Sequence, residues 1–363
     1  MHLLIALSGH GLGHLAQIGP VVNALVTQNP QYQITVMTAV PLALLQARIT
    51  VAFELWPLVV DPGMAMHNAL SVDVAASVAA YQAFHADWDD KVRALTQQLA
   101  SRAVDLIIAD VPYQVLAAAA PLHIPSVALC SLNWADIYAG FAPANAQTQR
   151  ILQQIQHAYA QAHCFLQPEP SMAMPELRLM PIKAIGPIAQ MGQNRQHEIK
   201  HPLGLAPTAK LVLVSLGGID TPLPLHQWPV IPDVFWIVPT TAEARQHPQA
   251  LALSAIAWPF VDILCSVDAF LTKPGYGSFA ESVCNGIPLI FVRRDHWPEQ
   301  EALIQWVMAH GVGYEIDWQQ LQQGELQAAL HWAFALGRQA PRQPTGIAQC
   351  VQLIQRLPYK NYN

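Results

Sequence analysis

The sequence predicts an α/β protein made of two Rossmann-like, doubly wound domains that face each other across a cleft. Short apolar, β-rich runs alternate with longer helical patterns, which is typical of parallel sheets with helices on both faces. The alternation occurs twice, and the stretch 167–208 between the halves is rich in Pro, Met and Gln and has few periodic elements. At 363 residues the chain is long enough for two domains with separate cores.

Four parts follow from this pattern: an N-terminal domain at 1–166, a junction at 167–208, a C-terminal domain at 209–345, and a final helix at 346–363 that we expect to pack back on the first domain. The expected strands of the first domain are 2–8, 33–39, 51–56, 105–110, 125–132 and 163–168. Those of the second are 210–218, 234–240, 253–258, 269–275 and 287–294. Open sheets of this kind bind ligands at the carboxyl ends of their strands, so we expect the site there.

Composition excludes several classes of protein. Hydrophobic residues make up 53% of the chain, the net charge is −6 and the 18 basic residues are scattered, which argues against a nucleic-acid partner. The five cysteines form no C-x-x-C pair, which indicates reduced thiols and no zinc site. With no basic leader and no apolar run near the roughly 20 residues that span a bilayer, we expect no transmembrane segment and a cytoplasmic location. Peripheral contact with the inner face of the membrane stays open.

The first strand ends in the loop "GHGLGH" at residues 9–14. This loop begins like a dinucleotide fingerprint but has His14 in place of the third glycine, and the second strand ends "VMTAV" without the acid that a ribose needs. We therefore expect no nicotinamide or flavin cofactor. The glycines still let the backbone approach a ligand, and the helix that follows aims free N–H groups into the cleft. His10 and His14 are candidates for a general base, and the alternative is that they only hydrogen-bond locally.

Asp110 ends the buried strand "DLIIAD" and would point into the same cleft. A carboxylate there can hold an imidazole in one tautomer and stabilise its charged form. The equally weighted alternative is that Asp110 caps the next helix.

The second half carries the features of an anion site. A strand at 269–273 runs into the turn and helix start that contain Gly275, Gly277 and Ser278, a combination suited to a diphosphate. The turn containing Gly217 and Gly218 ends the domain's first strand and can meet the same phosphates. Because the G-K-[ST] of a P-loop is missing, ATP hydrolysis is not indicated.

Polar side chains near this turn are suited to a sugar nucleotide. Glu281 lies one turn into the helix, where it can accept bonds from ribose hydroxyls, and Asp295, Glu299 and Gln300 can bind sugar hydroxyls. Together these features indicate a nucleotide-diphosphate sugar. The D-x-D-like "DWDD" at 87–90 lies in a helical pattern of the first domain, and we interpret it as a solvated helix face with no metal.

Residues 273–303 resemble the donor-binding signature of glycosyltransferases with the GT-B fold. The opening loop is similar to that of the enzyme that adds N-acetylglucosamine to the peptidoglycan lipid precursor. A closer resemblance is to the glycosyltransferase-like N-terminal region of plant-type L-arabinokinases. That region shares the G-H-G-x-G-H opening, a strand that ends in Asp, a second that ends near "NWADIY", the Gly-Tyr-Gly turn and "FVRRD". The resemblance spans residues 1 to about 345 and leaves out their kinase half, so we do not expect phosphorylating activity.

The resemblance implies a role for each of these positions. It gives His14 as the base with His10 beside it, near Asp110. The implied donor-binding residues are Gly217, Gly218, Trp258, Gly275, Tyr276, Gly277, Ser278, Glu281, Arg293, Asp295, Glu299 and Gln300. Within this set the glycines and Ser278 would serve the diphosphate, Glu281 the ribose, Glu299 and Gln300 the sugar, and Trp258 in the segment 257–260 the base.

The implied reaction is metal-independent, inverting transfer of a sugar from a nucleotide-diphosphate sugar, taken to be a UDP-sugar, to a hydroxyl acceptor. No cofactor is expected besides this donor substrate. The acceptor, lipid-linked or a small molecule, is not encoded in any readable motif. Two alternatives stay open: a UDP-sugar 2-epimerase of the same fold, and a non-catalytic nucleotide-sugar-binding protein.

Overall fold

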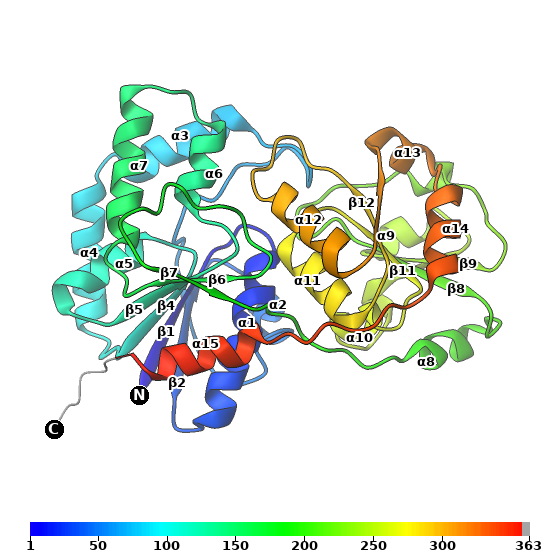
Figure 1. Ribbon diagram of the computed structural model, residues 1–363, viewed down its shortest axis with the longest axis horizontal. Helices are drawn as coiled ribbons and strands as arrows, with labels where there is room; N and C mark the ends of the chain where they lie inside the picture. Colours follow the sequence, from blue (N-terminus) through cyan, green and yellow to red (C-terminus); the bar gives the residue numbers. More distant parts are fainter. Residues whose placement is uncertain (358–363) are drawn as a thin grey trace.

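Two parallel sheets, one in each lobe, organise the residues 1–357 that the computed structural model describes (Figure 1). The first has the order β3-β2-β1-β4-β5-β6-β7 and the second the order β10-β9-β8-β11-β12-β13. The strands of the first sheet are β1 (His2–Leu7), β2 (Gln33–Thr38), β3 (Glu54–Pro57), β4 (Leu106–Asp110), β5 (Ser126–Leu129), β6 (Phe165–Pro168) and β7 (Ile182–Ile185). Those of the second are β8 (Lys210–Val214), β9 (Val234–Val238), β10 (Ala250–Ala252), β11 (Ala269–Thr272), β12 (Leu289–Val292) and β13 (Gly313–Ile316). The predicted pair of doubly wound α/β domains is confirmed.

Helices cover both faces of each sheet. In the first half they are α1 (Gly13–Gln28), α2 (Leu42–Gln46), α3 (Val74–His85), α4 (Trp88–Ala100), α5 (Gln114–Ala119), α6 (Trp134–Phe141) and α7 (Ala146–Tyr159). They continue with α8 (Gln196–Lys200), α9 (Thr241–Ala244), α10 (Phe260–Leu264), α11 (Tyr276–Asn285), α12 (Gln300–His310), α13 (Trp318–Gln323), α14 (Gln327–Leu336) and α15 (Gly346–Gln355). No helix in the described part of the chain combines the length and the apolar character needed to cross a membrane.

Three strands differ from the sequence prediction. The expected strand at 253–258 is wrong, because β10 ends at Ala252 and residues 253–255 form a single 3-10 turn. Strand β7 pairs in parallel with β6, so the stretch 167–208, expected to be a junction, adds an edge strand to the first sheet. Strand β13 forms the edge of the second sheet beside β12.

The sheet faces follow the two-residue alternation of side chains along each strand. On β1, Leu3, Ile5 and Leu7 pack into the same apolar cluster as α1, whereas Leu4 and Ala6 join the cluster that covers the other face. The first of these clusters also contains residues of α11 and of β11 and β12, so one apolar core runs through both lobes. The two domains are therefore joined by packing as well as by chain.

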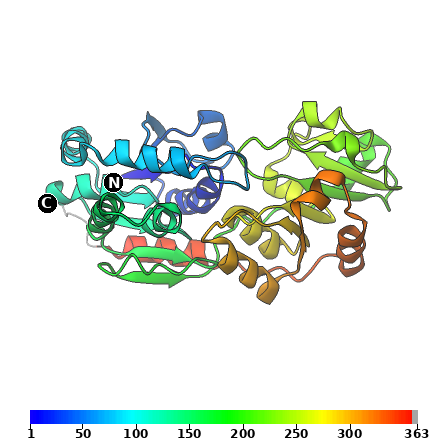
Figure 2. The same cartoon turned by 90° about the horizontal axis from the view of Figure 1, so that it is seen from above.

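The last described helix belongs to the first lobe. The chain leaves α14 in the second lobe and returns to the first, where α15 packs against α1 and β7 (Figures 1 and 2). Cys350, Val351 and Ile354 of α15 are buried in the shared core. This return crossing adds a second chain connection between the lobes.

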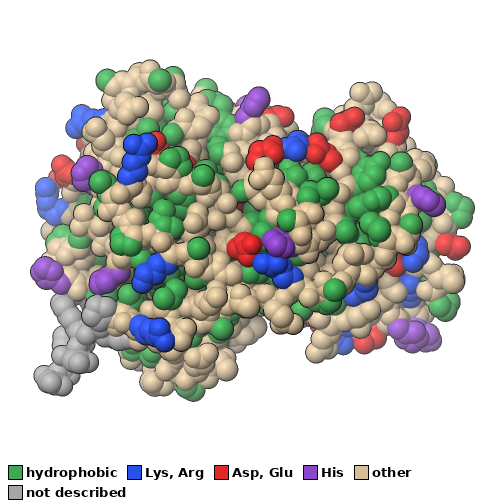
Figure 3. Space-filling view, viewed as in Figure 1, with side chains coloured by type: hydrophobic (Ala, Val, Ile, Leu, Met, Phe, Trp, Pro, Cys, Tyr) green, Lys and Arg blue, Asp and Glu red, His purple; other side chains and the backbone are tan. Residues whose placement is uncertain are grey.

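On the face visible in Figure 3, Lys and Arg side chains are scattered rather than gathered. At the start of α4 the three aspartates of the "DWDD" segment are exposed, whereas Trp88 is buried in the core. Asp89 and Asp90 favour the positive end of the helix dipole, and Asp90 pairs with Arg93. The solvated face expected for this segment is what the structure shows.

The chain reverses its strand order between β1 and β4 in the first sheet and between β8 and β11 in the second. The loops after these four strands face one another, because α1 and α11 pack together. Gly277 in α11 allows this approach: a Cβ at that position would lie 2.7 Å from the Cβ of Ala16 in α1.

We predict that Gly277→Ala lowers the free energy of unfolding by about 1–3 kcal/mol, the usual cost of overpacking. Adding Ala16→Gly removes the opposing methyl group and should recover part of the loss, although Gly inside a helix itself costs about 1 kcal/mol. Gly13→Ala is the matched control, because a Cβ at Gly13 meets no atom within 4 Å. Chemical denaturation gives the free energy of unfolding of the parent protein, of the two single variants and of the double variant. Equal losses for Gly277→Ala and Gly13→Ala would contradict the close approach.

Candidate active site

A cavity of about 320 Å³ lies between the two domains at the carboxyl ends of the strands. The first domain supplies the loop after β1, the start of α1, Arg48 and Ser131. The second supplies both glycine turns, the first turns of α11 and the loop before α12. The cavity is therefore at the edge where open α/β sheets bind their ligands.

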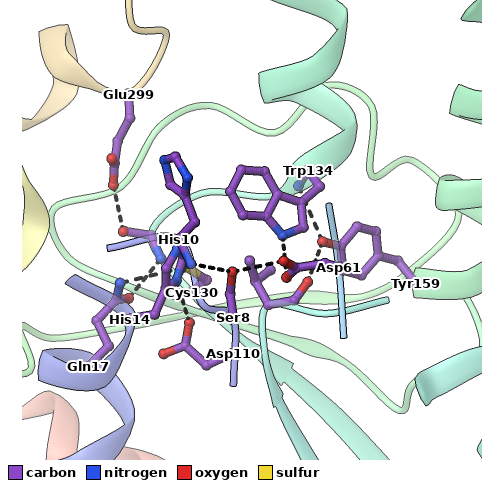
Figure 4. A network of polar contacts seen from close by, with 12 residues as sticks. Ser8, His10, His14, Gln17, Asp61, Asp110, Cys130, Trp134, Tyr159 and Glu299 are labelled. Atoms are coloured by element: carbon purple, nitrogen blue, oxygen red, sulfur yellow. Dashed lines mark hydrogen bonds and ion pairs between the residues drawn. The ribbon is translucent and has the colours of Figure 1, made fainter. Parts of the chain in front are cut away.

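His14 and Asp110 form a buried pair on the first-domain side. The Nδ1 of His14 donates to Oδ1 of Asp110 at 2.9 Å, and the two side chains are 4% and 0% exposed (Figure 4). Burial by itself would lower the pKa of His14, but the hydrogen bond and the charge of Asp110 outweigh it, so the pKa is raised above 6.5. Because Nδ1 carries the proton that Asp110 accepts, neutral His14 has its lone pair on Nε2.

His10 lies beside this pair but has a different chemistry. Its pKa is lowered well below 6.5, first by burial and then by the positive charges of His14, Arg294 and Lys273. The N–H of Met64 donates to His10 Nδ1 at 3.4 Å, which leaves the proton of the neutral ring on Nε2. The ring stacks on Trp297 of the other domain, with centroids 5.7 Å apart. His10 is thus a neutral donor, and it is His14 that has a basic nitrogen and a carboxylate partner.

A buried network holds the loop in place behind the histidines. Asp61 accepts from Ser8 Oγ at 3.1 Å and from Trp134 Nε1 at 2.8 Å, and Ser8 Oγ accepts the backbone N–H of His10 (Figure 4). Trp134 in turn lies edge-on to the His10 ring, with centroids 5.4 Å apart. Trp134 lies in the "NWADIY" motif of the resemblance, but its contact with Asp61 could not be predicted, because the two residues are 73 apart in the chain.

The glycine turns expected at the diphosphate line the opposite wall. Gly217, which has φ +94°, and Gly218 follow β8, while Gly275 and Gly277 flank the start of α11. Ser278 lines the cavity beside them. Tyr276 also reaches the cavity, but its hydroxyl accepts from Ile188 N–H at 2.8 Å and donates to the Glu169 carbonyl at 3.1 Å, so it ties α11 to the interdomain chain.

Glu281 is held by a residue of the other domain. Arg48 donates to its two carboxylate oxygens at 2.5 and 3.1 Å, and the side chains are 16% and 2% exposed. Arg48 also donates to Gln190 Oε1 at 2.7 Å, and burial of the guanidinium is outweighed by Glu281, which raises the pKa of Arg48. This ion pair lines the cavity and has no signal in the sequence, because the partners are 233 residues apart.

A second contact across the cleft involves Glu299. It accepts from Ser131 Oγ at 2.6 Å and from Trp297 Nε1 at 3.2 Å, and it lines the cavity from the second domain. Its carboxylate therefore lies between the two domains, near His10 and Trp297.

Four residues expected to bind the donor do not line the cavity. Gln300 uses its amide on the backbone of Arg294, and Arg293 points outward to Glu301 and Glu315. The other two are the exposed Asp295 and Trp258, whose ring is covered by the Arg195 guanidinium at 4.0 Å. The structure thus places Gln300, Arg293, Asp295 and Trp258 outside the lining of this cavity, and of the segment 257–260 it is Phe260 that lines it.

Two cations that the sequence prediction leaves out line the same wall. Lys273 directly follows β11 and Arg294 follows β12, and both face the cavity. Two basic residues at the carboxyl ends of neighbouring strands are a signal in the sequence that could have found them.

His14, Asp110 and Cys130 are the group within residues 1–357 whose potential metal ligands lie within 4.8 Å of one another. Burial raises the pKa of the Cys130 thiol well above its usual value. Cys130 Sγ lies 3.5 Å from His14 Nδ1 and accepts from Gln17 at 3.6 Å. We therefore interpret the group as a hydrogen-bonded cluster.

Comparison with known proteins identifies the kind of molecule. A family model described as UDP-glucoronosyl and UDP-glucosyl transferase matches residues 123–334. L-arabinokinase of Arabidopsis thaliana is 25% identical over 341 residues, which cover 92% of this chain and 32% of that protein. The chain thus spans about a third of the length of that curated relative. These matches confirm the resemblance that the motifs indicated.

Solved structures share the fold over nearly the whole chain. The glycotransferase of kitacinnamycin has a TM-score of 0.60 at 18% identity, covering 98% of this chain and 99% of that one. The calicheamicin glycosyltransferase CalG4 has a TM-score of 0.61 at 16% identity, covering 98% and 97%. UGT2 of Phytolacca americana, solved with UDP-2fluoro-glucose and pterostilbene, has a TM-score of 0.55 at 17% identity, covering 91% and 89%. At these identities the likeness shows the two-domain GT-B fold.

Proposed function

Because the chain belongs to the UDP-glucoronosyl and UDP-glucosyl transferase family, we propose that it moves a sugar from a UDP-sugar to an acceptor hydroxyl, with His14 as the general base. That it is a glycosyltransferase using a nucleotide sugar follows from the family; the base, the nucleotide, the stereochemistry and the metal independence are our proposals. The observation that carries them is the His14–Asp110 pair, which faces the glycine turns across one cavity.

The donor would lie along the second domain. Its diphosphate fits against the N–H groups of the turns at 217–218 and 275–278 and the start of α11, where the helix dipole favours negative charge. Its ribose fits at Glu281 and its sugar at Glu299, both of which line the cavity together with the turns and the histidines. Backbone donors of this kind can stabilise a leaving diphosphate without Mg²⁺.

The acceptor hydroxyl would lie on the first-domain side. His14 Nε2 takes the hydroxyl proton as the acceptor oxygen bonds to the sugar's anomeric carbon, and the bond from that carbon to the diphosphate oxygen breaks on the opposite side. Asp110 stabilises the imidazolium that forms. One base on one face and the leaving group on the other give a single displacement, which inverts the anomeric configuration.

The proposal is tested with His14→Ala in an assay of UDP release from a panel of UDP-sugars. Turnover should fall by roughly 10²–10⁴-fold, the usual share of a general base, while UDP affinity by calorimetry stays unchanged. Since His14 works unprotonated and its pKa is raised, activity of the parent protein should increase with pH through a value above 6.5. Asp110→Asn should move that rise to lower pH and reduce the maximum.

His10→Ala is the matched control, and its effect on turnover should be the smaller one. If His14→Ala instead abolishes UDP binding while His10→Ala abolishes turnover, the loop binds the nucleotide and His14 is not the base. A protein that converts a UDP-sugar without releasing UDP would point to an epimerase, and one that binds without converting would point to a sensor.

The ribose contact gives a separate prediction. Glu281→Ala should weaken UDP binding by about 1–3 kcal/mol, the scale of a hydrogen bond to a charged group, whereas Arg48→Met should retain it, because Glu281 is still present. Both variants should lose stability to unfolding by about 3 kcal/mol or more, because each leaves one buried charge without its partner. Calorimetry and denaturation separate the two effects. Equal UDP affinity in Glu281→Ala and the parent protein would remove the ribose from this position.

A further inference from the structure

A second buried carboxylate lies behind the histidine loop. Asp61 is in the loop that follows β3 and is 6% exposed. Its Oδ1 accepts from Ser8 Oγ at 3.1 Å, and its Oδ2 accepts from Trp134 Nε1 at 2.8 Å (Figure 4). An ionised carboxylate only accepts hydrogen bonds, and an indole N–H only donates them. Because both of its oxygens accept, Asp61 has the partners of a negatively charged carboxylate.

This carboxylate has no ion pair of its own. Among residues 1–357, Asp61 contacts no Lys or Arg side chain, and the facing group that can take a positive charge is His14. The other titratable groups that face it are Asp110 and the hydroxyls of Tyr81, Tyr113 and Tyr159. A buried charge without a partner is costly. A positive charge on His14 would therefore compensate that of Asp61.

Asp61 is connected to both imidazoles through its two donors. Ser8 Oγ accepts the backbone N–H of His10 at 3.3 Å. The Trp134 ring lies 5.4 Å from the ring of His10 and 5.9 Å from that of His14, measured between centroids. The carboxylate thus fixes one residue before the histidine loop and one ring that contacts both histidines.

The charges around His14 are mostly negative. Burial lowers the pKa of His14, and the hydrogen bond and charge of Asp110, followed by the charges of Asp61 and Glu299, raise it. The other titratable groups beside His14 are His10, whose pKa is lowered, and the Cys130 thiol, whose pKa is raised. Asp61 therefore favours the imidazolium form of His14 without contacting it.

We infer that Asp61 is a positioning residue of the transfer reaction: it fixes the loop that carries both histidines and stabilises the positive charge that His14 gains from the acceptor's proton. The inference rests on the proposed function and adds to it a residue that acts from behind the reacting groups. The proton moves from the acceptor oxygen to His14 Nε2, and Asp61 exchanges none.

The pH profile of kcat in Asp61→Asn tests this inference. Asparagine keeps the size of the side chain and an acceptor oxygen but removes the charge. The imidazolium of His14 is then less stable, so the rise of activity with pH should move to lower pH by about one unit, the scale of a nearby opposite charge. The maximum kcat should fall about 10- to 100-fold, the scale of a slightly misplaced catalytic group, while UDP affinity stays unchanged.

NMR titration of the His14 imidazole gives the same quantity without any substrate. The signal is assigned by its loss in His14→Ala, and its midpoint should be lower in Asp61→Asn than in the parent protein. A purely structural carboxylate would change stability and leave this midpoint where it is.

Asp136→Asn is the matched control. Asp136 is 8% exposed, lies two residues after Trp134, and accepts from the Asn133 amide and the Glu176 N–H. It is not among the groups that shift the pKa of His14. Removing this charge should therefore leave the His14 midpoint and the pH profile as they are in the parent protein.

Two further variants serve if Asp61→Asn does not fold. Ser8→Ala and Trp134→Phe each remove one donor from the carboxylate. Each should lower kcat and leave UDP affinity unchanged, and a parent-like kcat in both would overturn the positioning role.

Failure of the inference differs from failure of the proposed function. If the His14 midpoint and the pH profile are the same in Asp61→Asn and the parent protein, the role of Asp61 is overturned and the transferase proposal stands. Turnover that survives His14→Ala overturns the base of the proposed function, and the inference with it.

Discussion

The close approach of α1 and α11 is the contact on which the rest of the molecule depends. Gly277 faces Ala16 there, and an apolar core continues from one sheet to the other through these helices. Because the loop after β1 leads into α1 and the turn after β11 leads into α11, the same contact sets the distance between them. The cavity is therefore defined by packing, and two contacts between the domains line it: the Arg48–Glu281 ion pair and the Ser131–Glu299 hydrogen bond.

The second constraint is the electrostatic state of the histidine loop. The imidazoles of His10 and His14 lie side by side with little access to solvent, so they cannot both be charged at the same time. Asp110 raises the pKa of His14 while burial and three positive neighbours lower that of His10, so the two rings have separate protonation states. This division is the pattern of a base and a neutral donor that titratable pairs adopt in active sites. The opposite wall of the cavity has an excess of positive charge, because Lys273 and Arg294 have no free carboxylate as a partner in the part of the chain that the structure describes.

Much of the architecture could be predicted because buried parallel strands are nearly continuous apolar runs, as "HLLIAL" and "DLIIAD" are. The edge strand β7 could not, because its sequence, "IKAI", is mostly exposed and has no such run, and β10 is three residues long.

In the site, the glycine turns and His14 could be predicted, because their roles depend on residue type and on their position between a strand and a helix. Side-chain directions in an irregular loop have no periodicity, so the sequence favours Arg293 although Arg294 faces the cavity, and it favours Gln300 as a sugar ligand although Gln300 holds the loop backbone. Arg48 could not be predicted because its partner lies in the other domain.

The central claim is a single displacement assisted by His14, which lies across the cleft from the diphosphate. The anomeric configuration of the released sugar tests this claim most directly. Proton NMR during hydrolysis of a UDP-α-sugar in buffer with EDTA, recorded before mutarotation, reads this configuration with water as the acceptor. The account predicts the β-anomer first and an undiminished rate in EDTA. The α-anomer as the first product, or a reaction that needs added Mn²⁺, would contradict it.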